Sequence, residues 1–485
     1  MHFIVKVFPE IIIKSPPVRK RFIKQLRTNL RRLLEPLSEE ITVKRDWEKV
    51  EVIAPGADSG LAEQVADVLG RTPGIDAYAL VHAYPLGDLD EILARTLDHW
   101  GPALAGKTFC VRAKRSGKHD FKSGDIERYV GGGLLERTEA AGVSLRHPDI
   151  TVRLEVKRET LYVVEHQHRG LGGYPLGGPD AVLSLVSGGF DSIVASYLTM
   201  KRGMLTHFCF FNLGGRAHEM AVKEVSYYLW QKYGASHRIK FVTVPFEGVV
   251  SEILEKVDNA YMGVVLKRMM LRAATEVAES LEVPALVTGD SVAQVSSQTI
   301  PNLSAIDRVT DTLVMRPLIA MDKSDIIKLS RRIGTETFSA NVPEYCGVIS
   351  VKPTTAAKLH RVEHQETKFD FEVLKQAVAA QKVANIQELA EKAPDDDLNV
   401  PVESEVAEGA VVIDIRHPDE ESLKPLALPE PQLVKIPFFR LNTQFPKLDP
   451  DRRYLLYCGK GVMSQLHAAH LADAGHANVG VYLPK

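Results

Sequence analysis

The sequence predicts a multidomain protein of α/β and α+β class, and three observations lead to that expectation. Its 485 residues exceed the size of one ordinary domain. From residue 181 onward, apolar strand runs such as AVLSLV and LTHFCFFN alternate with helical patterns, which predicts a doubly wound parallel sheet. Before that, residues 1–75 read strand, helix, strand, helix, strand, an order typical of a small ferredoxin-like unit.

Composition shifts divide the chain further. A stretch rich in glycine and proline follows the second α+β block, and an acidic stretch follows the doubly wound sheet. The predicted organisation is a ferredoxin-like domain at 1–75, a second α+β domain at 76–168, a linker at 169–180, the parallel-sheet domain at 181–390, an acidic linker at 391–404 and a small α/β domain at 405–485.

Composition and cysteine usage limit the cellular context. The chain is 45% apolar and 25% charged, with a net charge of −2, as in globular proteins. No apolar run reaches membrane-spanning length, and the N-terminal apolar run is interrupted by charges, unlike a signal peptide. Its four cysteines form no regular framework. We therefore expect a cytoplasmic protein that does not bind membranes.

The near-zero net charge conceals two basic segments in the first part of the chain. Residues 14–32 carry eight Lys or Arg and no acid, and residues 107–122 are also strongly basic. Each segment alone would be explained by a solvated surface, but two together favour a nucleic-acid partner. The candidate RNA-binding residues are Lys20, Arg21, Lys24, Arg112, Lys114, Arg115 and Lys118.

One phosphate-binding motif in the sequence is in the wrong context. Residues 101–108, GPALAGKT, match the pattern G-x-x-x-x-G-K-[ST]. However, a helical pattern precedes the match and an alternating strand follows it, the reverse of the order that a phosphate-binding loop needs. We therefore read Gly106 and Lys107 as a helix stop and a strand start.

A second glycine loop has the required context. The apolar strand 181–186 runs into SGGFDS, residues 187–192, and then into an amphipathic helix that ends near Gly203. The glycines let the backbone approach an oxyanion, and the helix N-terminus supplies aligned amides. Asp191 is placed to hold Mg²⁺ or to orient phosphate-binding groups, and the alternative is that it only caps the helix. SGGxDS resembles the PP-loop of ATP pyrophosphatases.

Several further segments extend the resemblance to nearly the whole chain. Together with SGGFDS, the segments FFNLGGRAHE, MGVVLKRMM, LVTGDSVAQVSSQT and PEYCGVISVKPT resemble the tRNA 4-thiouridine synthetase (ThiI) family. The resemblance implies a THUMP RNA-binding domain after the ferredoxin-like domain and a rhodanese-like domain at the C-terminus. Residue 290 is an aspartate where many relatives have a glutamate.

The resemblance implies ATP and Mg²⁺ as cofactors and gives the site residues. The adenine side of the pocket would involve Leu185 and Val186, and Asp191 and Lys323 would be needed for adenylation. The complete set of implied ATP contacts is Leu185, Val186, Ser187, Gly188, Gly189, Asp191, Ser192, Lys267, Gly289 and Gln298, and no resident metal is implied.

Two of these positions can also be read from the residues themselves. Lys267 and Arg268 interrupt the apolar stripe of a helical pattern, so we expect both side chains to be free to reach a cleft, unless they form a solvated surface. Gly289 follows the strand pattern ALVT, at the end of a strand where open α/β sheets bind ligands. The alternative for Gly289 is an ordinary turn.

The C-terminal domain offers a candidate reactive thiol, Cys458, for which the alternative is a buried structural cysteine. Cys458 follows a strand pattern and opens a glycine-rich loop that leads into a helix, a setting that lowers a thiol pKa. The loop CGKGVMS, with Asp414 and Arg416 upstream, resembles a rhodanese active site. Val462 and Met463 stand where many thiosulfate-using rhodaneses have a basic residue, so thiosulfate need not be the donor.

The other cysteines differ in what can be said of them. Cys346 alone could be a small buried hydrophobe, but the family resemblance makes it the disulfide partner of Cys458. Cys110 and Cys209 lie in strand patterns and are expected in the core.

The reaction implied by the resemblance has two stages. ATP adenylates O4 of uridine at tRNA position 8, and sulfur from a Cys458 persulfide, or sulfide released from it by Cys346, then displaces AMP. The implied partners are tRNA, an IscS-type cysteine desulfurase as sulfur donor, a thiol reductant and the ThiS carrier protein, which receives sulfur for thiamine thiazole synthesis. The alternatives are a PP-loop amide ligase and a non-enzymatic RNA-binding sulfur relay.

Overall fold

The computed structural model describes residues 1–45, 49–56, 58–213, 216–340, 352–390, 400–407, 409–416, 421, 424–428, 432–437, 440–441, 444–459 and 462–484. Contacts between residues group the chain into two compact units. The first comprises residues 1–179 and 201–203, and the second comprises residues 180–200 and 204–485. In the described parts of the chain, no helix is long and apolar enough to cross a membrane.

The first unit is built on one eight-stranded sheet with the order β2-β3-β1-β4-β8-β7-β5-β6. The strands are β1 His2–Val7, β2 Thr42–Arg45, β3 Lys49–Ile53, β4 Ile75–Pro85, β5 Thr108–Ser116, β6 Gly142–Val143, β7 Ile150–Lys157 and β8 Thr160–Gly172. The helices are α1 Pro9–Ile12, α2 Pro16–Leu34, α3 Ser59–Arg71, α4 Leu89–Trp100, η1 Pro102–Leu104 and α5 Ser123–Arg137.

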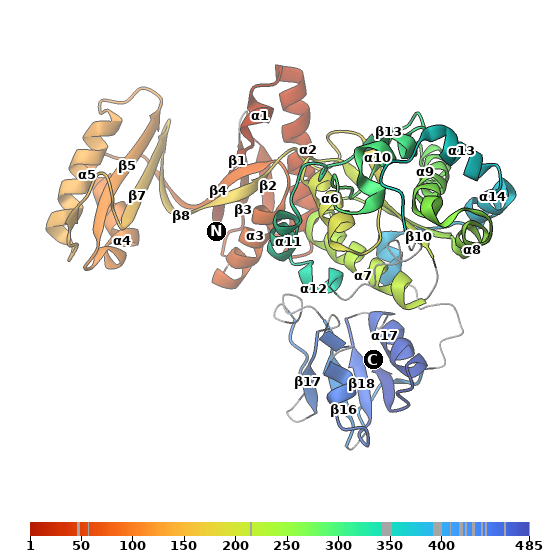
Figure 1. Ribbon diagram of the computed structural model, residues 1–485. Helices are drawn as coiled ribbons and strands as arrows, with labels where there is room; N and C mark the ends of the chain where they lie inside the picture. The colour runs from red at the N-terminus through yellow and green to blue at the C-terminus, as the bar shows by residue number, and fades with distance from the viewer. Residues whose placement is uncertain are drawn as a thin grey trace. The chain divides into compact units, whose positions relative to one another are not determined.

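Strands β4 and β8 join the two halves of this sheet. They pair antiparallel along almost their whole length, from Ile75 opposite Gly172 to Pro85 opposite Thr160, and Figure 1 shows them running between the two halves. The predicted boundary at 75/76 therefore falls at the start of a shared strand. The predicted linker at 169–180 begins inside β8, because the strand continues to Gly172.

Alternating side chains give this sheet one face that helices cover and a second face that is exposed only in part. On β1, Phe3 and Val5 pack in a core with helix α2, and on β5, Phe109 and Val111 pack in a second core with helices α4 and α5. On the other face Ile4 and Cys110 are also buried, whereas the basic side chains Arg112 and Lys114, further along β5, are exposed. The exposed part of this second, open face is therefore available to a polar ligand.

The second unit contains the predicted parallel sheet. Its order is β13-β12-β9-β10-β11-β14, in which only the edge strand β14 is antiparallel to its neighbour. The strands are β9 Ala181–Leu185, β10 Leu205–Asn212, β11 Lys240–Pro245, β12 Ala285–Val287, β13 Leu313–Met315 and β14 Lys382–Asn385. From β9 the chain continues to β10 on one side, and β12 lies on the other side, so the strand order reverses at β9. Open α/β sheets bind ligands at such a reversal.

Helices cover this sheet and bury an apolar core that includes Val242, Leu266 and Leu286. They are α6 Phe190–Lys201, α7 Arg216–Tyr233, α8 Glu247–Lys256, η2 Asn259–Tyr261, α9 Met262–Ser280, η3 Ser296–Gln298, α10 Ile300–Asp307, α11 Lys323–Ile333, α12 Glu336–Ser339, α13 Leu359–Glu366, α14 Phe371–Ala379 and η4 Ile386–Ala390.

The C-terminal part forms a separate five-stranded parallel sheet with the order β15-β19-β18-β16-β17. Its elements are β15 Val402–Glu403, β16 Val411–Asp414, β17 Leu433–Lys435, η5 Phe445–Lys447, β18 Tyr454–Tyr457, α17 Val462–Asp473 and β19 Val479–Tyr482. This sheet begins inside the predicted linker at 391–404, because β15 pairs with β19. The predicted multidomain fold class is confirmed.

Candidate functional site

The SGGFDS loop lies at the carboxyl end of β9 and leads into helix α6. Gly188 has a φ of +81°, a conformation that favours glycine. The Ser192 hydroxyl accepts a hydrogen bond from the Ser187 N–H at 3.2 Å and donates one to the Gly189 carbonyl at 3.2 Å. These bonds fix the loop beneath a helix N-terminus, which is the arrangement that binds phosphate.

Asp191 is held by two side chains from distant parts of the chain. The Lys323 ammonium, at the start of α11, lies 2.8 and 2.9 Å from the two carboxylate oxygens. The Gln294 amide donates to the same carboxylate at 2.7 Å. Asp191 therefore does more than cap the helix: it is part of a charged cluster on the phosphate-binding loop. Sequence reasoning paired Asp191 with Lys323 in function but missed Gln294.

Gly289 follows β12 and approaches the loop closely. A Cβ atom on this residue would lie 2.6 Å from the carbonyl carbon of Asp191 and 2.6 Å from the nitrogen of Ser192. Real Cβ contacts are never so short, so this position requires glycine. Gly289 therefore allows the segment after β12 to pack directly against the SGGFDS loop.

Lys267 and Gln298 meet at Asp290, the residue after Gly289. The Lys267 ammonium lies 2.8 Å from one carboxylate oxygen, and the Gln298 amide donates to the same oxygen at 3.2 Å. Burial alone would raise the pKa of Asp290, but Lys267, the Thr288 hydroxyl and Arg316 together hold it well below its usual range. The shorter aspartate thus still contacts both residues.

The prediction that Arg268 is free to reach a cleft is wrong. Arg268 is 2% exposed, and its guanidinium donates to both oxygens of Glu366, at 2.6 and 2.8 Å. The reason is helical geometry: adjacent residues on a helix point about 100° apart, so Lys267 and Arg268 do not share a face. Only Lys267 reaches the site.

The remaining predicted nucleotide residues lie along the same edge of the sheet. Leu185 ends β9 opposite Cys209, and the Val186 N–H donates to the Cys209 carbonyl at 2.9 Å. A buried residue that sequence reasoning missed is His218 on α7, which donates to the Ser187 carbonyl at 2.9 Å. Burial lowers the His218 pKa, and the bond to Ser187 partly offsets this, so a neutral ring supports the loop near pH 7.

Cys458 follows β18 in the C-terminal domain and is 8% exposed. Its sulfur accepts a hydrogen bond from the Ser464 N–H at 3.3 Å and lies 3.4 Å from the Ser464 hydroxyl. Donors from the first turn of a helix stabilise a thiolate. On neighbouring β16, Asp414 forms a buried ion pair of 2.6 Å with Arg416, which lies just after the strand.

Of the other three cysteines, the structure describes two. Cys110 and Cys209 are buried, at 2% and 0% exposure, and neither forms a disulfide, which confirms their expected place in the core. Burial raises the pKa of the Cys209 thiol far above its usual range, so it stays protonated. Cys346 lies outside the described residues, and its pairing with Cys458 stays a prediction.

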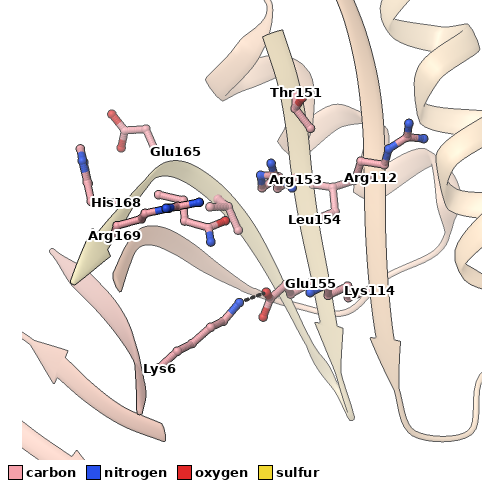
Figure 2. A pocket seen from close by; sticks show the side chains of 12 residues that line it. Lys6, Arg112, Lys114, Thr151, Arg153, Leu154, Glu155, Glu165, His168 and Arg169 are labelled. Carbon is pink, nitrogen blue, oxygen red and sulfur yellow. Dashed lines mark hydrogen bonds and ion pairs between the residues drawn. The ribbon is translucent and has the colours of Figure 1, made fainter. Parts of the chain in front are cut away.

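The open face of the first unit holds a polar hollow of about 450 Å³ (Figure 2). Arg112 and Arg153 lie on paired positions of β5 and β7, and the Lys6 ammonium lies 3.1 Å from Glu155. The hollow is lined by Lys6, Arg112, Lys114, Thr151, Arg153, Leu154, Glu155, Val164, Glu165, Gln167, His168 and Arg169.

The predicted RNA-binding residues lie in different places, and only some of them line the hollow. Arg112 and Lys114 line the hollow. Arg115 points to the opposite side of β5, where it donates to the Gly117 carbonyl and contacts His119. The exposed Lys118 lies beyond the end of the strand, and Lys20, Arg21 and Lys24 are exposed on α2, which covers the other face.

Three basic residues of the hollow were missed from the sequence: Lys6, Arg153 and Arg169. They lie in strands rather than in obvious basic runs, and only the period-2 alternation could have placed Arg153 beside Arg112.

Residues 101–108, which match the phosphate-loop pattern, have the secondary structure that the sequence predicts. Helix α4 ends at Trp100, a short η1 turn follows, and β5 begins at Thr108. Gly106 has a φ of +69°, and Lys107 is exposed. The order helix, turn, strand is therefore confirmed for residues 101–108, with no α-helix following the loop.

Comparisons with known proteins define the class. Family models match in sequence order: the ThiI ferredoxin-like domain over residues 2–79, the THUMP domain over 87–164, the thiamine biosynthesis protein (ThiI) over 177–371 and the rhodanese-like domain over 400–483. The chain thus has, in order, ferredoxin-like, THUMP, ThiI and rhodanese-like domains.

Full-length relatives identify the family. The chain is 56% identical to a tRNA sulfurtransferase of Pseudomonas aeruginosa and 54% identical to one of Azotobacter vinelandii, with 100% of both chains covered in each case. A crystal structure of a 4-thiouridine synthetase–RNA complex with bound ATP matches with a TM-score of 0.70 and 26% identity, covering 79% of this chain and 99% of that one. The chain belongs to the tRNA sulfurtransferase family, as the sequence predicts.

Proposed function

We propose that this chain uses ATP to activate uridine 8 of tRNA at O4 and then replaces that oxygen with sulfur. The observation that carries the proposal is the Asp191–Lys323 pair on a phosphate-binding loop at the strand-order reversal of a parallel sheet. Attack of O4 on the α-phosphate releases pyrophosphate and leaves AMP bonded to uridine. Oxygen at C4 then departs as AMP.

The site residues divide the work of binding and activation. The backbone of Ser187, Gly188 and Gly189, with the α6 N-terminus, is suited to the phosphates, while Leu185 and Val186 border the adenine side. The Lys323 ammonium is placed to offset charge that develops during phosphoryl transfer. Lys267 and Gln298 are the remaining proposed ATP contacts.

The donor set is compatible with Mg²⁺ that arrives with the nucleotide. Mg²⁺ in nucleotide sites takes one or two carboxylates, with phosphates and water completing the shell. Asp191 offers one carboxylate on the loop, whereas the described residues contain no group of three or more acidic, His or Cys side chains for a resident ion. Mg²⁺ would neutralise phosphate charge, and Asp191 would hold it.

The open face of the first unit is suited to the tRNA backbone. Arg112 and Arg153 are exposed on directly paired strand positions, where like charges repel. Phosphates between them would offset that repulsion, and Lys114 and Arg169 extend the positive surface. Lys20, Arg21 and Lys24 on α2, with Arg115 and Lys118, would add contacts outside the hollow.

Sulfur would arrive on Cys458. A cysteine desulfurase of the IscS type transfers sulfur to the thiolate, giving Cys458–S–SH, and the terminal sulfur attacks C4 of the adenylated uridine as AMP leaves. The Cys346 thiolate then attacks the Cys458 sulfur, which forms a Cys346–Cys458 disulfide and releases 4-thiouridine. A thiol reductant restores both thiols. In the cytosol such a disulfide is transient and catalytic.

The Cys458 persulfide would also have a second sulfur acceptor. The C-terminal carboxylate of the ThiS carrier protein, once activated as an acyl adenylate, would accept sulfur from Cys458 for thiamine thiazole synthesis.

The experiment that tests the proposed function is to supply wild type, Cys458→Ala and Asp191→Ala proteins to cells that lack this chain. Both variants should lack 4-thiouridine in mass spectra of tRNA nucleosides, and only Cys458→Ala should also lack thiazole synthesis.

The rival functions predict different results. A non-enzymatic sulfur relay predicts no pyrophosphate release that depends on ATP and tRNA, and an amide ligase predicts turnover with ammonia in the Cys458→Ala variant. Either result, or normal 4-thiouridine with Cys458→Ala, would overturn the proposal.

A further inference from the structure

Arg316 bridges two carboxylates beside the proposed ATP site. It is the first residue after β13, and its side chain is 12% exposed. Its Nε lies 3.2 Å from Asp290, and its two terminal nitrogens lie 2.9 and 2.5 Å from the oxygens of Asp307 at the end of α10. The planar guanidinium donates to both carboxylates in fixed directions, whereas an ammonium is a compact point charge on a flexible stem and lacks this fork geometry.

Asp290 is the centre of this network, and each of its oxygens has two donors. One oxygen accepts from Lys267 at 2.8 Å and from Gln298 at 3.2 Å. The other accepts from the Thr288 hydroxyl at 2.7 Å and from Arg316 at 3.2 Å. Because Asp290 is 7% exposed, water contributes little to holding it, and its orientation depends on these side chains.

The division of charge at Asp290 affects Lys267 directly. Lys267 and Arg316 both pair with the buried carboxylate of Asp290. Because Arg316 offsets part of that negative charge, Asp290 attracts the Lys267 ammonium less strongly. Without Arg316, Asp290 would draw Lys267 more strongly and would be free to rotate about its remaining donors. Both changes would leave less positive charge directed at a phosphate.

We propose that Arg316 is a positioning residue for nucleotide binding, which acts through Asp290 to set the Lys267 ammonium and the Gln298 amide. The inference rests on the proposed function, because Lys267 and Gln298 are proposed ATP contacts. Arg316 itself does not touch the nucleotide in this scheme. Its anchor is Asp307, which holds the far side of the guanidinium.

The test is a coupled set of variants. In Arg316→Gln, we expect the KM for ATP in tRNA thiolation to rise about tenfold, the scale of one lost charge-assisted hydrogen bond, while kcat changes little. In an Asp290→Asn background, adding Arg316→Gln should produce no further rise, because the carboxylate that connects Arg316 to Lys267 has been removed. Arg316→Lys should resemble Arg316→Gln, since lysine keeps the charge but lacks the planar fork that fixes Asp290 and Asp307 in their present directions.

Controls separate positioning from folding and from failure of the proposed function. Arg308→Gln removes an exposed arginine just after α10 and should leave the KM for ATP unchanged. Persulfide loading of Cys458 should be normal in every variant. If Arg316→Gln unfolds, the Arg316→Lys comparison carries the test.

An equal rise in KM in the Asp290→Asn background would show that Arg316 contacts ATP directly and would overturn the proposal. An unchanged KM in Arg316→Gln would overturn it as well. Failure of the proposed function is a different result: the wild-type protein itself would then show no dependence on ATP.

Discussion

The chain contains two glycine loops that resemble phosphate-binding motifs, and they differ in what surrounds them. Residues 101–108 match a general phosphate-loop pattern, but the loop connects helix α4 to strand β5. Residues 187–192 connect strand β9 to helix α6, so the loop lies at a helix N-terminus. We therefore expect the order of the flanking elements, rather than the glycine and lysine spacing, to decide which loop binds an anion.

The neighbours of the two loops strengthen this contrast. Beyond the first loop, β5 carries Arg112 and Lys114 onto an open face, a surface suited to many weak phosphate contacts. Around the second loop, Lys323, Gln294 and Gly289 converge on Asp191 and the loop backbone. The first region is suited to a long polyanion, and the second to one small ligand.

The largest effect is expected at the second loop. Asp191→Ala removes the carboxylate that holds Lys323 and Gln294, so we expect tRNA adenylation to fall by a factor on the order of 10²–10³ or more. Pyrophosphate release in the presence of tRNA measures it. Persulfide loading of Cys458, followed by mass spectrometry, should be unchanged, and loss of both activities in a folded variant would contradict the separation of the two sites.

A second change tests the close approach of β12 to this loop. Gly289→Ala places a Cβ atom 2.6 Å from the backbone at Asp191 and Ser192, so the two segments must separate. We expect the variant to lose about 1–3 kcal/mol of unfolding free energy and to bind ATP more weakly. Denaturant unfolding and ATP titration measure both. Gly263→Ala is a matched control, because its Cβ would meet open space.

The open face beyond the first loop should respond differently. Arg112→Gln and Arg153→Gln should each weaken tRNA binding several-fold and lower the slope of log affinity against log salt by about 1. Titrations of tRNA at several salt concentrations measure the slope, while the KM for ATP should not change. Arg146→Gln, an exposed arginine outside the lining of the hollow, is the control. Unaltered slopes in both variants would place the tRNA elsewhere.

The smallest effect is expected at the first loop itself. Lys107→Ala removes an exposed side chain with no α-helix N-terminus beside it, so the KM for ATP should stay within a factor of about two of the wild type. A small loss of tRNA affinity is compatible with its place before β5. A large loss of ATP affinity would mean that residues 101–108 bind nucleotide after all.

The sequence was sufficient where local order carries the information. The sequence correctly placed SGGFDS between a strand and a helix, and it correctly gave the order helix, turn, strand around Lys107. It failed where function depends on packing between distant segments. Arg316 and Gln294 give no local signal, because each acts on a carboxylate that folding brings to it. Arg268 was misplaced because an apolar stripe does not show which charged neighbour has a buried partner.

The long pairing of β4 with β8 has a consequence for synthesis of the chain. Ala79 pairs with Gln167, so the edge of β4 has no partner until residues up to Gly172 have left the ribosome. At roughly 5–20 residues per second, this delay lasts about 5–20 seconds. During that interval β4 presents unpaired backbone N–H and C=O groups on the side that β8 later occupies, and such an edge is a template for pairing with another chain.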